Sequence, residues 1–424
     1  MLRRQLAELT GRNVEDGAVV VLDNASGEVR AWIGSNARSS SSAEVDGVLA
    51  RRQPGSTLKP FVYELAFEKR LVTPATLIDD SQAQIATPGG LYLPQNYDRE
   101  WKGFVSARTA LGASLNVPAV RVAAMLGPDA LFERLRTLGF TLPESAGWYG
   151  ASLALGSADV SLLALTNAYR TFANAGMYSA PALRGAAGAK PVRVADAASV
   201  YLVTDILADN NARARTFGLA SALATRGFAA VKTGTSKDMR DNWCIGYTDR
   251  YTIGVWIGNA SGEAMHSVSG VSGAAPVWHA FASALHVGAP SKAPPPPVGV
   301  VRQRVAFDSA KEPPREEVFL LGSERAVLRE TAEVDGARRF GITSPRDGSV
   351  FAIDPDMPPA AQRITFEGER GQWVLDGRPL GTSERWRWAP WPGRHRLTLL
   401  GRDNQALQSV SFEVRGAGLK AGSK

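Results

Sequence analysis

Near the start of the chain, residues 54–70 read PGSTLKPFVYELAFEKR. Pro54 and Gly55 break the structure that precedes them. Pro60 falls within the first helical turn, where its missing N–H is tolerated. We therefore expect Ser56 at the start of a helix that is apolar on at least one face. The apolar side chains recur at helical spacing, at Leu58, Phe61, Val62, Leu65 and Ala66.

Ser56 and Lys59 can act together in this helix. Residues three positions apart share a helix face, so the hydroxyl and the amine can meet. A serine hydroxyl is a poor nucleophile at neutral pH, and a desolvated lysine with a lowered pKa can serve as its base. The Ser-x-x-Lys pattern occurs once in the chain. Alone it is weak evidence, because this spacing arises by chance in most chains of this length.

A second pattern is Ser114-Leu115-Asn116, in which Ser-x-Asn also occurs once. The Ser114 hydroxyl can relay a proton from lysine to a leaving amine. The Asn116 amide can orient the lysine and bind a substrate carbonyl. The alternative interpretation is a helix break ahead of Pro118, with Asn116 as a capping residue. Taken by itself, the short pattern favours this structural alternative.

A third pattern begins at Lys232 and reads KTGTS, after an apolar run that indicates a strand. Gly234 would let another backbone approach the strand closely. The Lys232 amine and the hydroxyls of Thr233 and Thr235 suit recognition of a substrate carboxylate. The backbone N–H groups of Thr235 and Ser56 would form an oxyanion hole. The alternative is an exposed edge strand with a lysine gatekeeper.

The three patterns together are far more specific than any one of them. Their order is the signature shared by β-lactamases and penicillin-binding proteins, and Leu115 stands where that signature has Asp. Competing hydrolase and zinc-protease signatures are absent from the sequence, which contains no G-x-S-x-G and no HExxH. A serine acyl-enzyme is therefore the chemistry that the sequence favours.

Other segments predict a mixed α/β protein. Apolar and alternating runs around turn residues predict one hairpin over 18–33 and another over 241–258. Helices in the middle of the chain, with strands at both ends, indicate a layered α/β architecture. The expected helices cover 106–126, 130–138, 161–175, 197–208 and 276–285.

The last third of the chain has a different residue pattern, with a proline-rich stretch followed by short strands. Residues 293–298 form a proline-rich linker, and after Phe340 short alternating strands and turns predict a small β-sandwich. The aromatics of this sandwich are more typical of packing than of a sugar-stacking platform; they are Trp373, Trp386, Trp388 and Trp391. We expect a catalytic domain over 1–292, a linker and irregular connection over 293–339, the sandwich over 340–416 and a flexible tail over 417–424.

The bulk composition excludes several classes of protein. The chain has 424 residues and a net charge of +7, but its basic residues are scattered, which does not favour a nucleic-acid surface. The single cysteine, Cys244, excludes an internal disulfide framework and a multi-cysteine metal site. No apolar stretch reaches the roughly 18 residues of a membrane span. The N-terminus does not read as a signal peptide, so this chain alone is expected to be soluble.

The similarity to penicillin-binding proteins continues outside the three motifs. It is carried by RRQPGSTLKPFVYELAFE, PQNYDREWKGFVSARTALGASLNVPAV, LALGSADVSLLALTNAYRTFANAG and VKTGTSKDMRDNWCIGYTDRYTIGVWIGN. These stretches resemble the transpeptidase half of class A penicillin-binding proteins, most closely the 1C type. The segment beginning ITSPRDGSVFAI resembles the β-sandwich appended to that type. The resemblance implies an α/β (α+β) domain of the serine transpeptidase and β-lactamase kind, with an antiparallel sheet and a helical subdomain, followed by an all-β, immunoglobulin-like sandwich.

The resemblance also implies roles for the motif residues. Ser56 would be the acylated nucleophile and Lys59 its base, while Ser114 and Asn116 would serve proton relay and substrate binding. The substrate carboxylate and the oxyanion would be held by Lys232, Thr233, Gly234 and Thr235. The implied donor is a peptidoglycan stem peptide ending in D-Ala-D-Ala, and the acceptor is the amine of a second stem. β-Lactams would acylate Ser56, and no metal or organic cofactor is implied.

The family sets expectations of context as well. It implies the periplasmic face of the bacterial inner membrane, with cell-wall synthesis proteins as candidate partners of the C-terminal domain. Full members carry a membrane anchor and a glycosyltransferase domain ahead of the transpeptidase, and this chain carries neither, so glycan polymerisation is not expected of it. The alternatives are a D,D-carboxypeptidase or β-lactamase, in which water receives the acyl group, and a β-lactam sensor or scaffold without glycosyltransferase activity.

Overall fold

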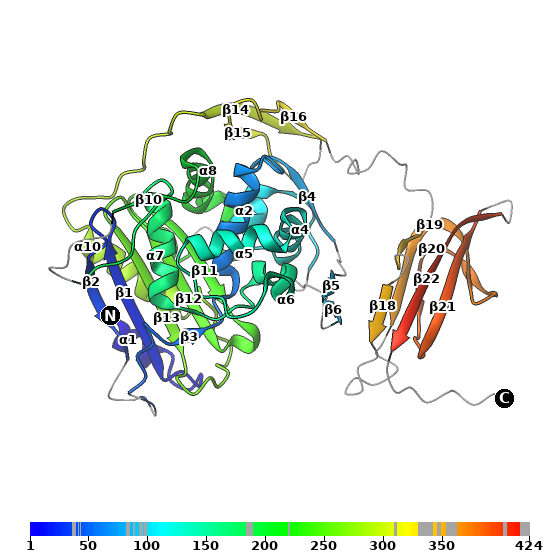
Figure 1. The fold of residues 1–424 in the computed structure, drawn as a ribbon, viewed down its shortest axis with the longest axis horizontal. Coiled ribbons are helices and arrows are strands. Elements are labelled where there is room, and N and C mark those ends of the chain that lie inside the picture. The colour runs from blue at the N-terminus through cyan, green and yellow to red at the C-terminus, as the bar shows by residue number, and fades with distance from the viewer. Residues whose placement is uncertain are drawn as a thin grey trace. The chain divides into compact units, whose positions relative to one another are not determined.

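A computed structural model of the chain describes residues 1–35, 40, 42, 44–81, 85–87, 90–92, 96, 100–183, 190–218, 221–308, 312–329, 342–345, 349–352, 363–401 and 405–415. The chain divides into two compact units (Figure 1). The first comprises Met1–Ala83 and Pro94–Glu330, and the second comprises Gln84–Leu93 and Thr331–Lys424. Among the described helices, none combines the length and apolar character that crossing a membrane requires.

A five-stranded antiparallel sheet forms the centre of the first unit, in the order β11-β12-β13-β1-β2. The two expected hairpins are both present in it. The pair β1 and β2 provides the first, and β12 and β13 provide the second. The strands are β1 Asp16–Asp23, β2 Val29–Ile33, β11 Ala230–Thr235, β12 Asp241–Tyr247 and β13 Tyr251–Gly258.

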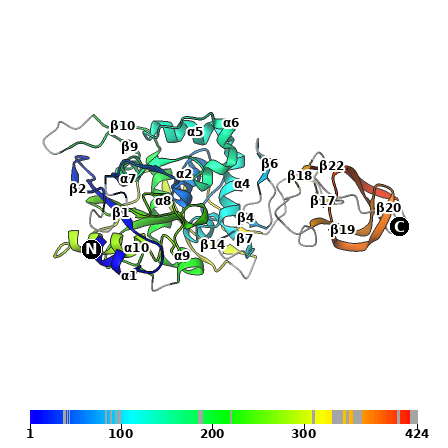
Figure 2. The same cartoon turned by 90° about the horizontal axis from the view of Figure 1, so that it is seen from below.

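Helices cover both faces of this sheet (Figures 1 and 2). Because side chains alternate along a strand, Val20 joins the core beneath α2, α7 and α8, while Val19 and Val21 join a second core beneath α1 and α10. The covering helices are α1 Leu2–Glu8, α2 Lys59–Glu68, α7 Leu162–Ala173, α8 Ala197–Ala208 and α10 Ala274–Leu285. The mixed α/β architecture expected from the sequence is confirmed.

The segment expected as one helix over 106–126 is two helices, α3 Ala107–Gly112 and α4 Asn116–Leu126. The break falls at Ser114, whose φ is +61°, and at the extended Leu115. The expectation of one helix was wrong because both helices bury their apolar residues in the same core, so the hydrophobic pattern runs across the break. The structural alternative, a helix break ahead of Pro118, describes the backbone correctly.

Short elements complete this unit. The remaining helices are α5 Pro128–Thr137, α6 Ala146–Tyr149 and α9 Asn210–Phe217, with 3-10 turns η1 Gly55–Leu58, η2 Gly150–Leu155 and η3 Lys237–Met239. The remaining strand pairs are β3 Arg51–Arg52 with β8 Val160–Ser161, β4 Leu77–Asp80 with β7 Gly103–Ser106, and β9 Met177–Tyr178 with β10 Val192–Arg193. A hairpin of β5 Ile85–Thr87 and β6 Gly90–Tyr92 is counted with the second unit.

The region expected as an irregular connection, 293–339, contains regular structure in its described part. After the proline-rich stretch come β14 Val300–Phe307, β15 Arg315–Leu320 and β16 Val327–Leu328, which form a three-stranded sheet within the first unit. Val318 and Leu320 of β15 are buried in the core beneath α2, α7 and α8. The irregular connection was therefore a wrong description of these residues, because burial against distant helices stabilises a sheet that has little sequence signal of its own.

An ion cluster fixes this sheet to α3. The Arg108 guanidinium is buried, and its Nε lies 2.9 and 3.0 Å from the two carboxylate oxygens of Glu317 on β15. Its terminal nitrogens bind Asp205 at 2.5 Å and Asp209 at 3.1 Å. We call these four residues the Arg108 cluster. It connects residues beyond the proline-rich stretch to the helix that precedes Ser114.

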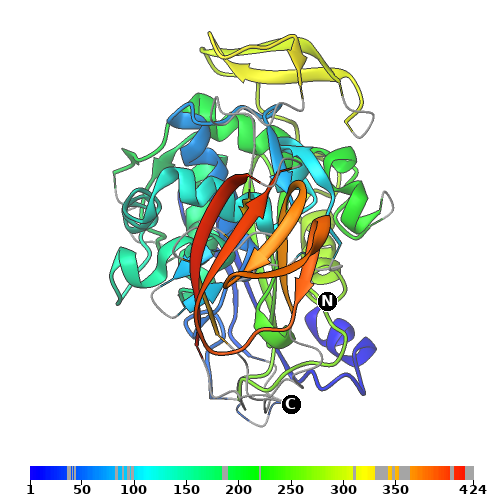
Figure 3. The same cartoon turned by 90° about the vertical axis from the view of Figure 1, so that its right-hand side faces the viewer.

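The second unit is all-β, as expected (Figure 3). Within it, β19 pairs with β20 along one edge and with β17 and β21 along the other, and β22 joins β21 to β18. Trp373 and Trp388 are buried in its core, as predicted, whereas Trp391 is 49% exposed and packs edge-on against Trp388. The expected tail, 417–424, lies outside the described residues. The strands are β17 Ile342–Ser344, β18 Ser349–Ala352, β19 Ile364–Leu375, β20 Arg378–Trp388, β21 Gly393–Leu400 and β22 Ala406–Arg415.

Arg108→Met should reduce the free energy of unfolding of the first unit by about 3–5 kcal/mol, because it leaves the fully buried Glu317 without its main cationic partner. Urea unfolding followed by tryptophan fluorescence measures this loss. Arg136→Met is the matched control, since it removes an exposed ion pair with Glu133, and it should cost at most about 1 kcal/mol. Equal losses in the two variants would contradict a structural role for the Arg108 cluster.

Candidate active site

The turn η1 presents Ser56 at the surface of the core while α2 buries Lys59. The turn is held by its neighbours: the Thr57 hydroxyl donates to the carbonyl of Pro54 at 2.8 Å, and the Tyr169 hydroxyl donates to the carbonyl of Thr57 at 2.7 Å. Ser56 is partly exposed, whereas Lys59 has no exposed surface. Ser56 therefore stands at the start of a helix, as predicted. That helix is buried on nearly all sides rather than on one face.

Glycines bring this turn into direct contact with β11. A Cβ on Gly55, whose φ is +55°, would come within 2.5 Å of the Thr235 carbonyl oxygen. A Cβ on Gly234 would come within 2.4 Å of the Pro54 carbonyl oxygen. The prediction that glycine in this strand allows a close backbone approach is confirmed. Ser56 is thereby held beside Thr235.

Lys59 reaches across to the break between α3 and α4. Its Nζ donates to the Ser114 carbonyl at 2.5 Å and to the Asn116 side-chain oxygen at 2.6 Å, and it lies 3.4 Å from the Ser114 hydroxyl. Within the described residues these are its hydrogen bonds, and none joins it to the Ser56 hydroxyl. The first two patterns are therefore brought together by the lysine amine.

Lys232 completes the cluster from β11. Its Nζ donates to the Ser114 hydroxyl at 2.7 Å and to the Thr233 carbonyl at 2.9 Å, and its side chain is buried. One serine hydroxyl thus lies between two buried lysine amines. Ser114, Lys59, Asn116 and Lys232 come from three distant parts of the sequence, and we call them the lysine cluster.

Burial weakens the basicity of both lysines. Desolvation lowers the pKa of Lys59 well below its usual value, the charge of Lys232 lowers it further, and Asp80 opposes the shift. Desolvation also lowers the pKa of Lys232, to about 7, with the charge of Arg213 acting in the same direction. A neutral lysine at physiological pH can accept a proton from a serine hydroxyl.

The other residues of the third pattern lie along β11. Thr233 is buried and faces Cys244 across the strand pair, and burial raises the pKa of that thiol. The Thr235 hydroxyl is partly exposed and accepts a hydrogen bond from the Gly270 N–H at 3.1 Å. Thr235 therefore lies where a hydroxyl and a backbone N–H can meet a ligand beside Ser56. The alternative of a solvent-exposed edge strand is wrong, because Lys232 and its neighbours are buried.

Two supporting residues were not identified from the sequence. Asn96 accepts from the Asn116 N–H at 2.9 Å and donates to the Asp80 carboxylate at 2.7 Å. Both are buried, so they fix the start of α4 and bring a negative charge toward Lys59. Asn96 lies in the stretch PQNYDREWKGF that carries the family resemblance, but nothing in its spacing indicated that it would reach Asn116.

Ser114 occupies a strained backbone position. A positive φ at a non-glycine residue costs about 1–3 kcal/mol and persists where surrounding contacts impose it. Here the contacts are the hydrogen bond from Lys59 to its carbonyl and the bond from Leu115 N–H to the Ala110 carbonyl at 2.9 Å. In this conformation the Ser114 hydroxyl lies 2.7 Å from the Lys232 amine.

This arrangement agrees with comparison to known families. Residues 17–274 match the penicillin-binding protein transpeptidase domain, and this range includes every residue of the lysine cluster. The chain belongs to the penicillin-binding protein transpeptidase family. Residues 329–412 match a second family, the Penicillin-Binding Protein C-terminus Family, which confirms the resemblance stated for the second unit.

Individual relatives support the same assignment. Penicillin-binding protein 1C of Escherichia coli K12 is 35% identical over 264 residues, which cover 61% of this chain and 33% of that protein. Penicillin-binding protein 1A of Neisseria lactamica is 33% identical over 307 residues, covering 67% and 38%. The chain thus matches about a third of the length of these relatives.

Solved structures show the same fold. Penicillin-binding protein 1A of Haemophilus influenzae superimposes with a TM-score of 0.61 and 22% identity, over 73% of this chain and 54% of that one. PonA1 of Mycobacterium tuberculosis, in complex with penicillin V, superimposes with a TM-score of 0.57 and 22% identity, over 69% and 84%.

Ser114→Gly and Ser114→Ala separate strain from chemistry. Both variants should slow acylation by penicillin about 10²-fold or more, because both lack the hydroxyl between the lysines. Ser114→Gly should be the more stable of the two, by about 1 kcal/mol, because glycine accepts the positive φ. Stopped-flow acylation and urea unfolding measure the two effects. Acylation that recovers in the glycine variant would show that Ser114 acts only through the backbone.

The pKa shifts predict how acylation depends on pH. The rate constant should rise from about pH 6 to about pH 8, because raising the pH removes the proton that keeps the lysine cluster fully charged. Lys232→Arg replaces the amine whose pKa is about 7 with a permanent charge, so this inflection should be lost in that variant. Acylation by a fluorescent penicillin across this pH range is the measurement. An inflection that persists in the variant would contradict its assignment to Lys232.

Proposed function

We propose that this chain is a peptidoglycan D,D-transpeptidase that crosslinks stem peptides through an acyl-enzyme on Ser56. The observation that carries the proposal is the Ser114 hydroxyl held between two buried lysines, one of which, Lys59, follows the partly exposed Ser56 by one helical turn. A role in peptidoglycan synthesis is consistent with the family to which the chain belongs.

Acylation begins with attack of the Ser56 hydroxyl oxygen on the carbonyl of the penultimate D-Ala. Lys59 accepts the hydroxyl proton as a neutral base, a form that its lowered pKa favours. The resulting oxyanion is stabilised by the backbone N–H groups of Ser56 and Thr235. These two residues lie beside each other because Gly55 packs on the Thr235 backbone.

Collapse of the tetrahedral intermediate breaks the peptide bond and releases D-Ala. Its amine takes a proton from the Ser114 hydroxyl, and the lysines on either side of that hydroxyl replace the proton. The amine of a second stem then attacks the acyl carbonyl and forms the new peptide bond, losing its proton through the same relay. The ester bond to Ser56 breaks, and the Ser56 oxygen takes back a proton from Lys59.

The carboxylate of the donor peptide would bind at β11. Thr235 is partly exposed and contributes a hydroxyl, while Thr233 and Lys232, one and two residues before Gly234, contribute a second hydroxyl and an amine. Asn116 orients Lys59 and can also receive the substrate amide. Gly234 keeps β11 close to the turn η1, which contains Ser56.

We propose transfer to an amine rather than to water. Hydrolysis needs a base that activates water. The Asp80 carboxylate, which acts on Lys59, is not placed for that role, because it has no exposed surface and accepts hydrogen bonds from Asn96 and from the Lys102 N–H.

We further propose that the chain acts on the periplasmic face of the inner membrane, where its substrate is found. The second unit would then be the part available to other cell-wall synthesis proteins. In this proposal the catalytic domain extends through the β14–β16 sheet, since that sheet is fixed to α3 by the Arg108 cluster.

Ser56→Ala should abolish covalent labelling by a fluorescent penicillin, whereas the wild-type chain should carry one label per molecule. The expected loss is complete, because the acylated atom itself is removed. Intact mass spectrometry measures the adduct. Lys59→Met should retain the fold and lose labelling as well. A Ser56→Ala protein that still acquires the label would end the proposal.

Product analysis distinguishes the reactions open to the acyl-enzyme. With purified peptidoglycan precursor and an amine acceptor, we expect crosslinked dimer in excess of hydrolysed stem peptide. Liquid chromatography with mass detection separates crosslinked dimer, peptide shortened by D-Ala, and hydrolysed β-lactam. Shortened peptide alone would assign a carboxypeptidase, and a stable lactam adduct without any peptide product would assign a sensor.

A further inference from the structure

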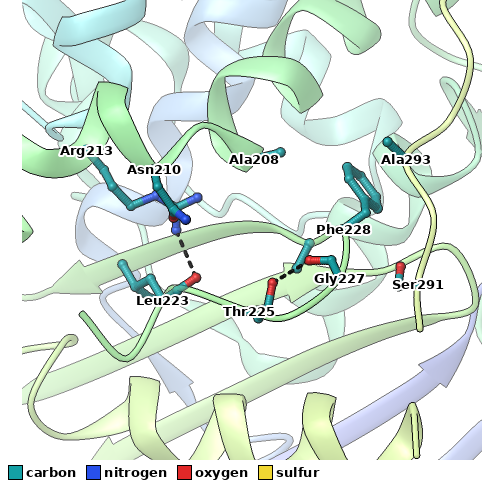
Figure 4. Close-up of a pocket in the computed structure, with 10 residues that line it drawn as sticks. Ala208, Asn210, Arg213, Leu223, Thr225, Gly227, Phe228, Ser291 and Ala293 are labelled. Atoms are coloured by element: carbon teal, nitrogen blue, oxygen red, sulfur yellow. Dashed lines mark hydrogen bonds between the residues drawn. The ribbon is translucent and has the colours of Figure 1, made fainter. Parts of the chain in front are cut away.

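A cleft of about 320 Å³ lies at the opposite end of β11 from Thr235 (Figure 4). It is formed where the loop leading into β11 meets the end of α8, the start of α9 and the segment around Ser291. Its lining mixes polar groups with apolar ones. The residues that matter here are Asn210, Arg213, Thr225, Phe228, Ser291 and Ala293.

Arg213 brings a buried cation to this cleft. Its side chain is 4% exposed, and its hydrogen bonds go to the backbone carbonyls of Leu207 at 2.6 Å, Leu223 at 3.3 Å and Asp209 at 3.4 Å. A guanidinium has more N–H donors than these bonds use. In the part of the chain that the structure describes, no carboxylate lies within ion-pairing distance of Arg213. The Asp209 carboxylate is bound to Arg108 and to the Asn211 N–H instead.

A buried guanidinium without a carboxylate in contact is costly, and a bound anion would lower that cost. The charge of Asp209 offsets only part of it. The surroundings favour such an anion. Arg226 and Lys292 are exposed and flank lining residues on both sides of the cleft, while the nearby Asp249 binds the backbone N–H of Lys292. The Asn210 amide is partly exposed at the cleft and adds a further hydrogen-bond donor.

The other lining residues favour an anion that also carries an apolar group. Phe228 and Ala293 line the far side of the cleft from Arg213 in Figure 4 and present apolar surface. Ligand sites of this size combine apolar walls with a few polar groups that fix orientation. We propose that the cleft binds a small organic carboxylate, with the carboxylate on Arg213 and an apolar body against Phe228.

The cleft and the lysine cluster are separated by few residues. A second, much smaller cavity of about 10 Å³ shares Arg213 and Leu223 with the cleft and is also lined by Lys232 and Thr233. The charge of Arg213 is one cause of the low pKa of Lys232. An anion on Arg213 would offset that charge, so the pKa of Lys232 would rise.

Benzoate, benzamide and inorganic phosphate are suitable probes, since benzamide matches the shape of benzoate without its charge. Binding to the full chain is measured by ligand-observed NMR and calorimetry. Benzoate should bind saturably, and benzamide and phosphate at least about tenfold more weakly, because a charge-assisted hydrogen bond or the apolar contact is missing. Equal binding of benzamide, or of phosphate, would overturn the assigned ligand class.

The active site itself is expected to take carboxylates, so its contribution must be removed. Benzoate should still bind after Ser56 has been acylated by penicillin, and also in Ser56→Ala. These arms separate the two proposals: loss of labelling concerns the reaction at Ser56, whereas retained benzoate binding concerns the cleft. Benzoate binding that disappears on acylation would place the ligand in the active site and overturn the inference.

Two variants test the location of the site. Arg213→Met should weaken benzoate binding at least about tenfold by removing the cation. If that buried substitution impairs folding, Ala293→Trp fills the exposed side of the cleft, and it should weaken benzoate binding while leaving penicillin acylation unchanged. Arg136→Met, on the distant helix α5, is the control and should bind benzoate like the wild type. Unchanged binding in Ala293→Trp would overturn the site.

Discussion

Two lysine amines withdrawn from water, on either side of one serine hydroxyl, are the constraint on which the structure depends. Lys59 and Lys232 are both buried, and their hydrogen bonds go largely to neutral oxygens of Ser114, Asn116 and Thr233. Neutral acceptors stabilise an ammonium less than carboxylates do, so burial weakens both bases. A lysine that is neutral at physiological pH is what a serine nucleophile needs.

Burying those amines requires the turn η1, β11 and the break between α3 and α4 to pack closely together. Glycine at 55 and 234 lets the turn η1 and β11 meet backbone to backbone, which leaves no room for a side chain at either position. The break at Ser114 turns a hydroxyl and a carbonyl toward the lysines. The Arg108 cluster then fixes α3, just before that break, to a sheet formed by residues more than 180 positions later. The contacts that stabilise the first unit are therefore also those that position the lysine cluster.

The sequence was most informative where chemistry and local conformation coincide. Ser56 at a helix start, the two hairpins and Lys232 on a strand were predicted from short patterns, because each depends on neighbours in the chain. The break at Ser114 was given only as an alternative, since apolar residues continue through both helices. Asn96, Asp80 and the β14–β16 sheet were missed for a different reason. Their partners, Asn116, Lys59 and Arg108, are distant in sequence, and no periodicity encodes such pairings.

The excess of buried positive groups near β11 bears on which lysine acts as the base and which as the acid. The charge of Lys232 lowers the pKa of Lys59, and the charge of Arg213 lowers that of Lys232, while Asp80 is the carboxylate whose charge acts on Lys59. In our proposal the donor peptide brings a second carboxylate to β11, beside Lys232 rather than Lys59. Its charge would raise the pKa of Lys232 more than that of Lys59. Substrate binding would then leave one lysine neutral to accept the serine proton and the other protonated to supply the leaving amine through Ser114, so that a single buried cluster provides both the base and the acid.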